Sequence, residues 1–211
     1  MEGAKYLIEG QRGEEVSRLT ADYVVSTIPT PDFVHMLSPA PQSGVLTSTG
    51  RLGYLAMIVL YIITPDRPLL ETSYVYYLER PYHRLPDINK FCVDLCPPEE
   101  NMLAVEFSCH TDQPLWGKSA QELMELSLSG LEKDGVIARE DVRKVFAVKA
   151  ASAYPIFHCS YRPHLDKVKA YVRSQPRLAL LGRTGDYRYI DSDQCMEQAF
   201  SLAEEIARKA G

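Results

Sequence analysis

The sequence predicts an α+β fold, in which an antiparallel or mixed sheet carries helices. Most of its strand-like runs are joined by short turns, and short connections favour antiparallel pairing. Helical patterns with recognisable start and stop signals follow these runs. The 211 residues, 45% of them hydrophobic, are enough for a sizeable core.

The N-terminal part of the chain predicts a hairpin followed by a short buried strand. The stretch "KYLIEGQRGEEVSRL" reverses direction around residues 11–13, and residues 23–25 form the buried strand. Pro29 and Pro31 end that strand, because proline cannot donate a ladder hydrogen bond. Residues 38–44, "SPAPQSG", predict a linker.

Four strand-like runs follow the linker, at residues 54–63, 72–79, 90–95 and 102–110. Alternating apolar side chains of the last run share one face of the predicted strand. They are Leu103, Val105, Phe107 and Cys109.

The remaining chain predicts three helices and two more strands. Ser119 and Glu122 form a capping box that begins the first helix, and Gly135 ends it. The apolar side of this helix consists of Leu123, Leu126, Leu128 and Leu131. The later elements are a strand at residues 142–157, a helix at 162–176, a strand at 178–181 and a final helix up to Lys209.

Charge and hydropathy argue against two classes of partner. The net charge is -5 and the cations are scattered, whereas nucleic-acid-binding proteins usually present a basic face. The longest apolar run, residues 54–63, is about half the length needed to cross a bilayer. We therefore expect neither nucleic-acid binding nor a membrane span.

The five cysteines indicate a reduced, cytoplasmic setting, because their number is odd and no paired framework is evident. No apolar secretory signal opens the chain. Cys92, Cys96, Cys109 and His110 are irregularly spaced, and the adjacent Cys109 and His110 would point to opposite faces of a strand. We therefore expect buried thiols and no metal site.

A polar and aromatic stretch, "GRTGDYRYIDSDQ" at residues 182–194, connects the last strand to the last helix. The first N–H groups of a helix are unpaired, so such a connection is suited to bind an anion. Gly182 and Gly185 would let a ligand approach the backbone closely.

The side chains of the same stretch suit a ligand that has phosphates and a flat ring system. Arg183 offers a fork of donors, and Tyr187 and Tyr189 offer hydroxyls and ring faces. Asp191 or Asp193 is expected to cap the helix. The alternative interpretation is a polar loop before a capped surface helix.

The segment "LLGRTGDYRYIDSDQCMEQAF" resembles the C-terminal flavin-binding segment of the glutathione-reductase-like FAD flavoproteins, in the amine oxidase and protoporphyrinogen oxidase group. It is especially similar to the UDP-galactopyranose mutase form: Gly-Arg, a short spacer, Tyr-x-Tyr, then Asp before a helix. "LTADYVVSTIPTPDF" resembles the strand that re-enters the FAD domain of this family. "FSCHTDQPLWGKSAQELMELSLSGLEKDGVI" resembles its substrate-domain pattern, and "ASAYPIF" its tyrosine-proline element.

The resemblance implies a division of the chain into three parts. Residues 1–38 would be a remnant of the FAD-binding Rossmann-like domain, residues 39–174 the substrate-binding domain, and residues 175–211 the C-terminal flavin-binding segment with its helix.

The resemblance also implies site residues. Those expected at FAD are Gly182, Arg183, Asp191, Ser192, Asp193 and Gln194. Those expected at the substrate are Tyr154, Tyr187 and Tyr189. None of these positions supplies an evident acid or base, so the catalytic residues stay unknown, which suits hydride transfer from a small-molecule substrate to FAD.

The chain departs from the family in one respect. The family's Gly-x-Gly-x-x-Gly turn, which cradles the FAD pyrophosphate, has no match here. We therefore expect a C-terminal half that binds FAD weakly alone, and that either meets a second chain carrying the other half or self-associates. Three functions stay open: a partial amine oxidase-type oxidoreductase, a mutase-like enzyme acting on a nucleotide sugar, and a non-catalytic fragment or subunit.

Overall fold

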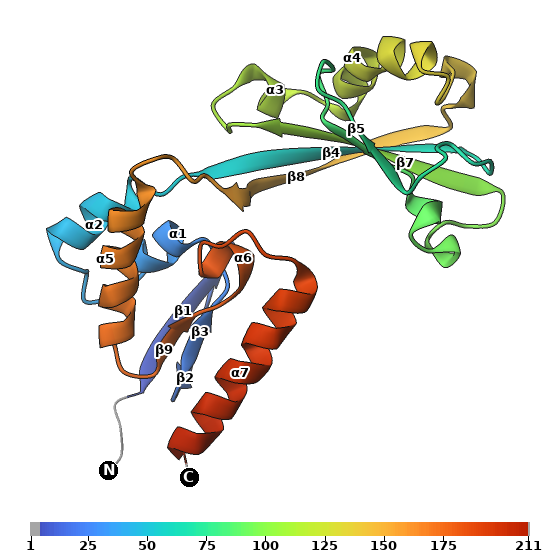
Figure 1. Ribbon diagram of the computed structural model, residues 1–211. Coiled ribbons are helices and arrows are strands. Elements are labelled where there is room, and N and C mark those ends of the chain that lie inside the picture. The colour runs from blue at the N-terminus through green and yellow to red at the C-terminus, as the bar shows by residue number, and fades with distance from the viewer. Residues whose placement is uncertain (1–4, 211) are drawn as a thin grey trace. The chain divides into compact units, whose positions relative to one another are not determined.

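The computed structural model describes residues 5–210, and the chain forms two compact units. Unit 2 is residues 54–153, and unit 1 is the described chain before and after it. Figure 1 shows the elements of both units, which we describe separately.

Unit 2 is built on a five-stranded sheet with the order β5-β6-β7-β4-β8. Its long central strands β4 and β7 pair antiparallel, from Ala56 opposite Cys109 to Pro65 opposite Glu100. This confirms the predicted antiparallel or mixed sheet. The elements are β4 (Tyr54–Pro65), β5 (Tyr74–Tyr76), β6 (Arg84–Pro86), η1 (Ile88–Lys90), η2 (Val93–Leu95), β7 (Glu100–Cys109), α3 (Pro114–Gly117), α4 (Ala120–Lys133), η3 (Arg139–Asp141) and β8 (Lys144–Pro155).

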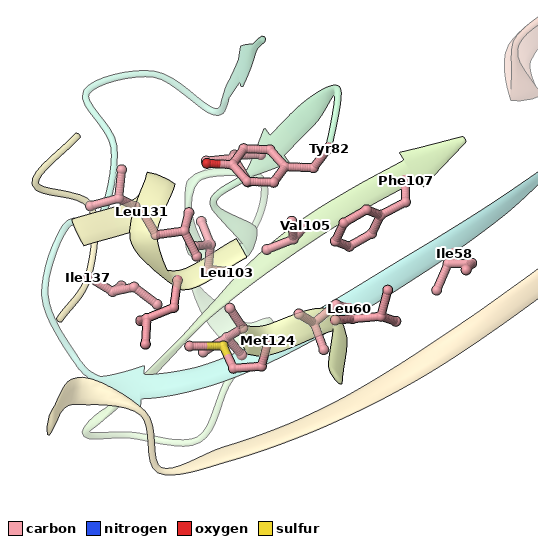
Figure 2. Packing of buried hydrophobic residues seen from close by; sticks show 14 of the residues in the cluster. Ile58, Leu60, Tyr82, Leu103, Val105, Phe107, Met124, Leu131 and Ile137 are labelled. Atoms are coloured by element: carbon pink, nitrogen blue, oxygen red, sulfur yellow. The ribbon is translucent and has the colours of Figure 1, made fainter. Parts of the chain in front are cut away.

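One face of this sheet packs against α4, and the buried side chains between them form the core of unit 2 (Figure 2). Alternate residues of β4 point into it, because side chains of a strand alternate between faces. The fully or almost fully buried members from the two central strands are Ala56, Ile58, Leu60, Ile62, Leu103, Val105, Phe107 and Cys109. The predicted apolar face of β7 is therefore confirmed.

The helix α4 begins and ends as predicted. Ser119 accepts a hydrogen bond from the Glu122 backbone N–H, and the Glu122 carboxylate accepts one from the Ser119 backbone N–H. Gly135 follows the helix with a φ of +68°, which glycine adopts without strain. The predicted apolar side of α4 is wrong at Leu126, which is exposed, whereas Met124 is buried. A turn of about 100° per residue carries Leu126 off the face shared by residues 123, 124, 128 and 131.

The strand predicted at residues 90–95 is wrong. The backbone there forms the short turns of η1 and η2, with local bonds such as Leu95 N–H to Cys92 C=O. Phe91 and Leu95 are exposed, so no sheet face covers the apolar side chains that suggested a strand. The adjoining strand is instead β6, which pairs with β5 and β7 and is only three residues long.

Unit 1 contains two small sheets and five helices among the described residues. The predicted hairpin is confirmed as the antiparallel pair β1–β2, and the strands β3 and β9 pair parallel. The elements are β1 (Tyr6–Arg12), β2 (Glu15–Ala21), β3 (Val24–Ser26), α1 (Thr30–His35), α2 (Ser43–Thr49), α5 (Tyr161–Ser174), β9 (Leu178–Leu180), α6 (Gly182–Gly185) and α7 (Ser192–Ala210).

The predicted linker at residues 38–44 is wrong at its end, because α2 already begins at Ser43. α2 packs against α5 within unit 1, so both helices lie outside the sheet unit. The compact units thus divide the chain near residues 53 and 153, whereas the sequence suggested divisions at 38 and 174. The assignment of these parts to FAD and substrate stays a prediction.

Apolar side chains are exposed on several elements of unit 1. Val25 and Ile28 are exposed, although residues 23–25 were expected to form a buried strand, whereas Leu178 is buried. Further exposed apolar side chains lie on the hairpin and on α7: Leu7, Ile8, Val16, Leu19, Met196 and Phe200. In the described part of the chain, none of the helices combines the length and the apolar composition needed to cross a membrane.

Candidate functional site

The segment 182–194 begins with a sharp turn at the end of β9. Gly182 has a φ of +78°, a conformation that glycine adopts readily and other residues rarely do. The chain then makes the single helical turn α6, and the Asp186 backbone N–H donates to the Gly182 carbonyl at 2.9 Å. The tight strand-to-helix connection expected from the sequence is therefore present.

Gly185 faces the chain's own backbone. A Cβ atom at this position would lie 2.5 Å from the Ser26 carbonyl oxygen and 2.8 Å from the Thr27 Cα. Thr30 holds the contact by donating its hydroxyl to the Gly185 carbonyl at 2.9 Å. The expectation that Gly185 lets a ligand approach is thus wrong, because β3 and the residues after it occupy the space.

Arg183 lies over two aromatic rings. Its guanidinium carbon is 5.2 Å from the ring centroid of Tyr154 and 5.1 Å from that of Tyr189. The two rings are themselves 5.5 Å apart and tilted by 39°. Each cation–π contact contributes about 0.5–2 kcal/mol. Three of the predicted site residues, Tyr154, Arg183 and Tyr189, therefore lie together. We call these three residues and Asp191 the Arg183 cluster.

Hydrogen bonds fix the guanidinium in this cluster. Its Nε donates to the Ile190 carbonyl at 2.7 Å, and its Nη2 donates to the Asp191 carboxylate at 2.9 Å. The Asp191 side chain is 82% exposed, so this ion pair contributes at most about 1 kcal/mol. The two rings and the hydrogen bond to the Ile190 carbonyl therefore orient Arg183, while the Asp191 carboxylate beside it stays exposed to solvent.

The helix α7 begins at Ser192, directly after Asp191. The Asp191 backbone N–H donates to the Gln194 side chain at 3.1 Å, and the Asp191 carbonyl accepts from Cys195 N–H at 3.0 Å. Gln194, expected at FAD, thus helps to close the start of the helix. Ser192 and Asp193 are exposed. The predicted helix start near residues 191–193 is confirmed.

Tyr187 takes a structural position rather than the substrate-facing one expected for it. Its side chain is 1% exposed, and its hydroxyl lies 2.8 Å from the Gly53 carbonyl oxygen and 2.9 Å from that of Ile156. Burial raises the pKa of this hydroxyl, although the two backbone bonds act in the opposite direction. The ring has no surface to offer a ligand.

The sequence interpretation missed several basic residues close to Tyr189. A hollow of about 580 Å³ beside α5 is lined by the cations Arg162, Lys169, Arg173 and Arg188, together with Tyr189. The available signal was spacing: residues 162, 169 and 173 are seven and four apart, which places them on one face of a helix. In the described part of the chain, no group of three or more His, Cys, Asp and Glu side chains is arranged to hold a metal ion.

No model of a known protein family matches this chain, and no curated protein matches it in sequence. Solved structures do match it. A reduced UDP-galactopyranose mutase matches with a TM-score of 0.68 and 19% identity, over 82% of this chain and 38% of the mutase chain. A putative protoporphyrinogen oxidase from Exiguobacterium sp. 255-15 matches with a TM-score of 0.69 and 18% identity, over 97% of this chain and 47% of the other.

A putrescine oxidase with redesigned cofactor binding matches with a TM-score of 0.67 and 12% identity, over 91% of this chain and 44% of the other. The fold is shared with these enzymes. The predicted resemblance to the amine oxidase and protoporphyrinogen oxidase group, and to UDP-galactopyranose mutase, is therefore confirmed at the level of fold. The chain spans less than half the length of each of these three proteins.

Proposed function

We propose that this chain is the flavin-facing and substrate-facing part of an FAD-dependent oxidoreductase of the amine oxidase type. The observation that carries the proposal is the Arg183 cluster. It stands between β9 and the start of α7, in a fold shared with a mutase and two oxidases. The same connection was singled out by its sequence for a ligand with a flat ring.

The groups of the cluster fit the flavin end of the cofactor. Arg183 supplies a fixed positive charge, and the first turn of α7 adds the partial positive charge of a helix N-terminus. Both favour a ligand that carries or gains negative charge. FAD, when bound, would accept the hydride, while Arg183 would orient it and Tyr154 and Tyr189 would line the substrate side. No described residue forms a glycine-rich turn suited to the pyrophosphate, so the fit is partial.

A second polypeptide carrying the dinucleotide-binding half would complete the site. The pair β3–β9 is a parallel sheet of two strands, and parallel sheets are normally covered on both faces. Two hollows of about 460 and 550 Å³ adjoin β9 and α7. Neither is lined by Met196 or Phe200, which are exposed elsewhere on α7. A parallel α/β partner would extend this sheet and cover exposed side chains of α7, and self-association is the competing outcome.

A mutase-like reaction on a nucleotide sugar is the second candidate. The exposed Tyr189 hydroxyl and the basic hollow next to it favour this reading, because a diphosphate needs cationic donors. A non-catalytic binding subunit is the third possible outcome. The substrate of the chain thus distinguishes the candidates, whereas the flavin is common to the first two.

The test is a native purification from the source organism with an affinity tag on this chain. We expect a complex that contains stoichiometric flavin and a second polypeptide with a Gly-x-Gly-x-x-Gly turn, identified by mass spectrometry. Arg183→Ala should lower the flavin content about tenfold, since a charge-assisted contact is lost. Arg208→Ala, in the last turn of α7, is the matched control and should retain the flavin. A folded, flavin-free chain would overturn the proposal.

A further inference from the structure

The strand β5 ends the five-stranded sheet of unit 2, with β6 beside it on one side only. The Asp87 N–H donates to the Ser73 carbonyl at 2.9 Å, so Ser73 bonds across to the chain that follows β6. Residues two apart face the same side of an antiparallel ladder, so Val75 also bonds towards β6. Tyr74 and Tyr76 therefore direct their backbone N–H and C=O groups away from the sheet.

These outward backbone groups form an edge to which another extended chain can pair. The Tyr74 carbonyl already accepts a hydrogen bond from the Thr72 hydroxyl at 2.8 Å. The groups offered to a further strand are therefore the Tyr74 N–H and the N–H and C=O of Tyr76. We call the backbone and side chains of Tyr74 and Tyr76 the β5 edge.

The two rings of the β5 edge are exposed and held in place. Tyr74 and Tyr76 are 45% and 60% exposed, and their ring centroids lie 5.5 Å apart. The guanidinium carbon of Arg84 is 5.6 Å from the centroid of Tyr74 and 5.8 Å from that of Tyr76. Two bonds of 2.7 Å to Glu106 fix this guanidinium. Because the rings are already ordered, a partner that packs on them loses little further side-chain entropy.

Phe91 connects this aromatic surface to a hollow. Its ring stacks on that of Tyr74 at 6.4 Å, and its side chain is 56% exposed. It follows Lys90, which lines a hollow of about 660 Å³. Asp87 also lines this hollow, and its backbone bonds to Ser73 at the start of β5. The Tyr74 end of the β5 edge therefore adjoins the hollow.

Negative charge is in excess in this hollow, which we call the acidic hollow. Its charged lining is Asp66, Asp87, Asp94, Glu99 and Glu100, with Arg67 and Lys90. Asp87 is buried and accepts three hydrogen bonds from neighbouring amides, so it serves the fold. Glu100 lies 3.6 Å from Arg143, and Arg67 pairs at 2.8 Å with Asp141, which is outside the lining. Three carboxylates thus remain against one lysine, which favours a cationic partner.

We propose that the β5 edge and the acidic hollow together bind an extended segment of a partner protein, with alternating apolar side chains and lysines or arginines at one end. The segment adds a strand beside β5, and its apolar side chains pack on the rings of Tyr74, Tyr76 and Phe91. Its basic end enters the acidic hollow.

A second copy of this chain fits the charge of the surface less well, because each copy carries a net charge of -5. The proposal does not depend on the proposed flavin site. Every residue that it uses lies in unit 2, and none belongs to the Arg183 cluster.

The experiment is fluorescence anisotropy of labelled peptides titrated with the purified chain. The probes are peptides of alternating valine and threonine that carry a pair of lysines at the N-terminus or at the C-terminus, since the added strand can run in either direction. We expect one of them to bind, with an affinity that falls as salt rises. Its counterpart with glutamates in place of the lysines should bind at least about tenfold more weakly. Absence of binding by both lysine peptides at millimolar concentration, or equal binding of the glutamate peptide, would overturn the proposal.

N-methylated peptides test strand pairing without altering the protein. Every second N–H of an added strand faces its neighbour. Methyl groups on the set of nitrogens that faces β5 should abolish binding, whereas methyl groups on the other set should preserve it. Equal behaviour of the two sets would show that no strand adds to the edge.

Variants of the chain locate the site. Tyr76→Ala should weaken binding of the lysine peptide about fivefold, because a ring contact is lost. Leu78→Ala truncates a side chain that is 99% exposed beyond the end of β5, and is the matched control. Asp94→Asn should weaken binding about threefold, and Glu204→Gln, which removes the same charge from α7, is its control. Equal weakening in a variant and its control would overturn the site.

The oligomeric state tests the competing occupant. We expect the dependence of the molecular mass on concentration, measured by sedimentation equilibrium, to be the same for Tyr76→Ala and the original chain. A dimer of the original chain that Tyr76→Ala dissociates would assign the β5 edge to a second copy and overturn the partner segment.

Discussion

The two units differ in the size of the buried apolar core that each encloses, although both leave some large apolar side chains exposed. Unit 2 encloses a core between α4 and a five-stranded sheet, where Ile58, Leu60 and Phe107 have no exposed surface. Unit 1 has two sheets of two strands and leaves Leu7, Val16 and Phe200 exposed. Unit 2 therefore has the features of a self-sufficient fold, whereas unit 1 has the features of a fold that needs a partner to cover it.

The largest expected effect is in the core of unit 2. Phe107→Ala should lower the free energy of unfolding of unit 2 by about 4 kcal/mol, because it leaves a cavity at a fully buried site. Phe200→Ala makes the same change at an exposed position of α7 and should alter stability by less than about 0.5 kcal/mol. Chemical denaturation of both variants measures the comparison. If Phe200→Ala were equally destabilising, unit 1 would have to be regarded as complete.

The same pair of variants tests the proposal that a partner covers unit 1. Phe200→Ala should reduce recovery of the second polypeptide in the native purification, whereas the folding of the variant chain should be unchanged. A hydrophobic interface loses affinity when a large side chain at its centre is truncated. Full recovery of the partner would place its contact elsewhere.

The next effect concerns a buried ion pair of unit 2. The Glu106 carboxylate accepts two bonds from Arg84 at 2.7 Å, and its side chain is 8% exposed. Burial alone would raise the pKa of Glu106, but hydrogen bonds from His83 and Arg84 outweigh it and hold that pKa below its ordinary value. Glu106→Gln should cost about 3 kcal/mol at neutral pH, because Arg84 is left without its partner.

The sign of the pH dependence follows from the lowered pKa. The contribution of Glu106 is fully present above the ordinary value of 4.5 and is lost as the pH falls through the folded-state value. The free energy of unfolding, measured by denaturation at pH values between neutral and 3, should therefore depend less on pH for Glu106→Gln than for the original chain. Glu125 accepts bonds from both terminal nitrogens of Arg139, but its side chain is 47% exposed, so this surface pair contributes little. Glu125→Gln is therefore the control and should leave the midpoint nearly unchanged.

A smaller effect is expected at Gly185 in unit 1. The added Cβ of Gly185→Ala would press on the Ser26 carbonyl and Thr27, and backbone cannot move away as a flexible side chain can. We expect a loss of about 2 kcal/mol, measured as a lowered thermal midpoint. Gly117→Ala has open space around its Cβ and serves as the control. Equal midpoints for the two variants would show that α6 does not pack on β3.

Local sequence signals predicted the elements that unit 2 needs. Alternation identified the buried face of β7, and the capping box of Ser119 and Glu122 identified the start of α4, because both depend on residues a few positions apart. Residues 90–95 gave a false strand, since apolar composition does not say whether a partner strand exists. The short β6 was missed because three residues show no period.

The candidate site was predicted only in part, because it depends on contacts between residues that are far apart in the sequence and on a local change in backbone conformation. Arg183, Tyr154 and Tyr189 meet as expected, but Gly185 is set by a contact with Ser26 that lies far away in the sequence. Tyr187 and Tyr189 are two residues apart and share a residue type, yet one is buried and the other exposed. A left-handed backbone at Tyr187, with a φ of +50°, breaks the regular alternation that would have put both on one side.

This difference between neighbouring tyrosines gives the smallest predicted effect. Tyr187→Phe removes a hydroxyl that bonds the carbonyls of Gly53 and Ile156, so it should lower the free energy of unfolding by about 1 kcal/mol. Tyr189→Phe removes a hydroxyl at an exposed position and should leave stability unchanged within about 0.5 kcal/mol. Ligand binding should respond in the opposite order, because of these two tyrosines only Tyr189 exposes its side chain to the basic hollow between α5 and residues 186–190. Denaturation and pyrophosphate titration of both variants test this exchange of roles. If Tyr187→Phe weakened binding while leaving stability intact, the buried position would be a site residue after all, and the sequence expectation for it would stand.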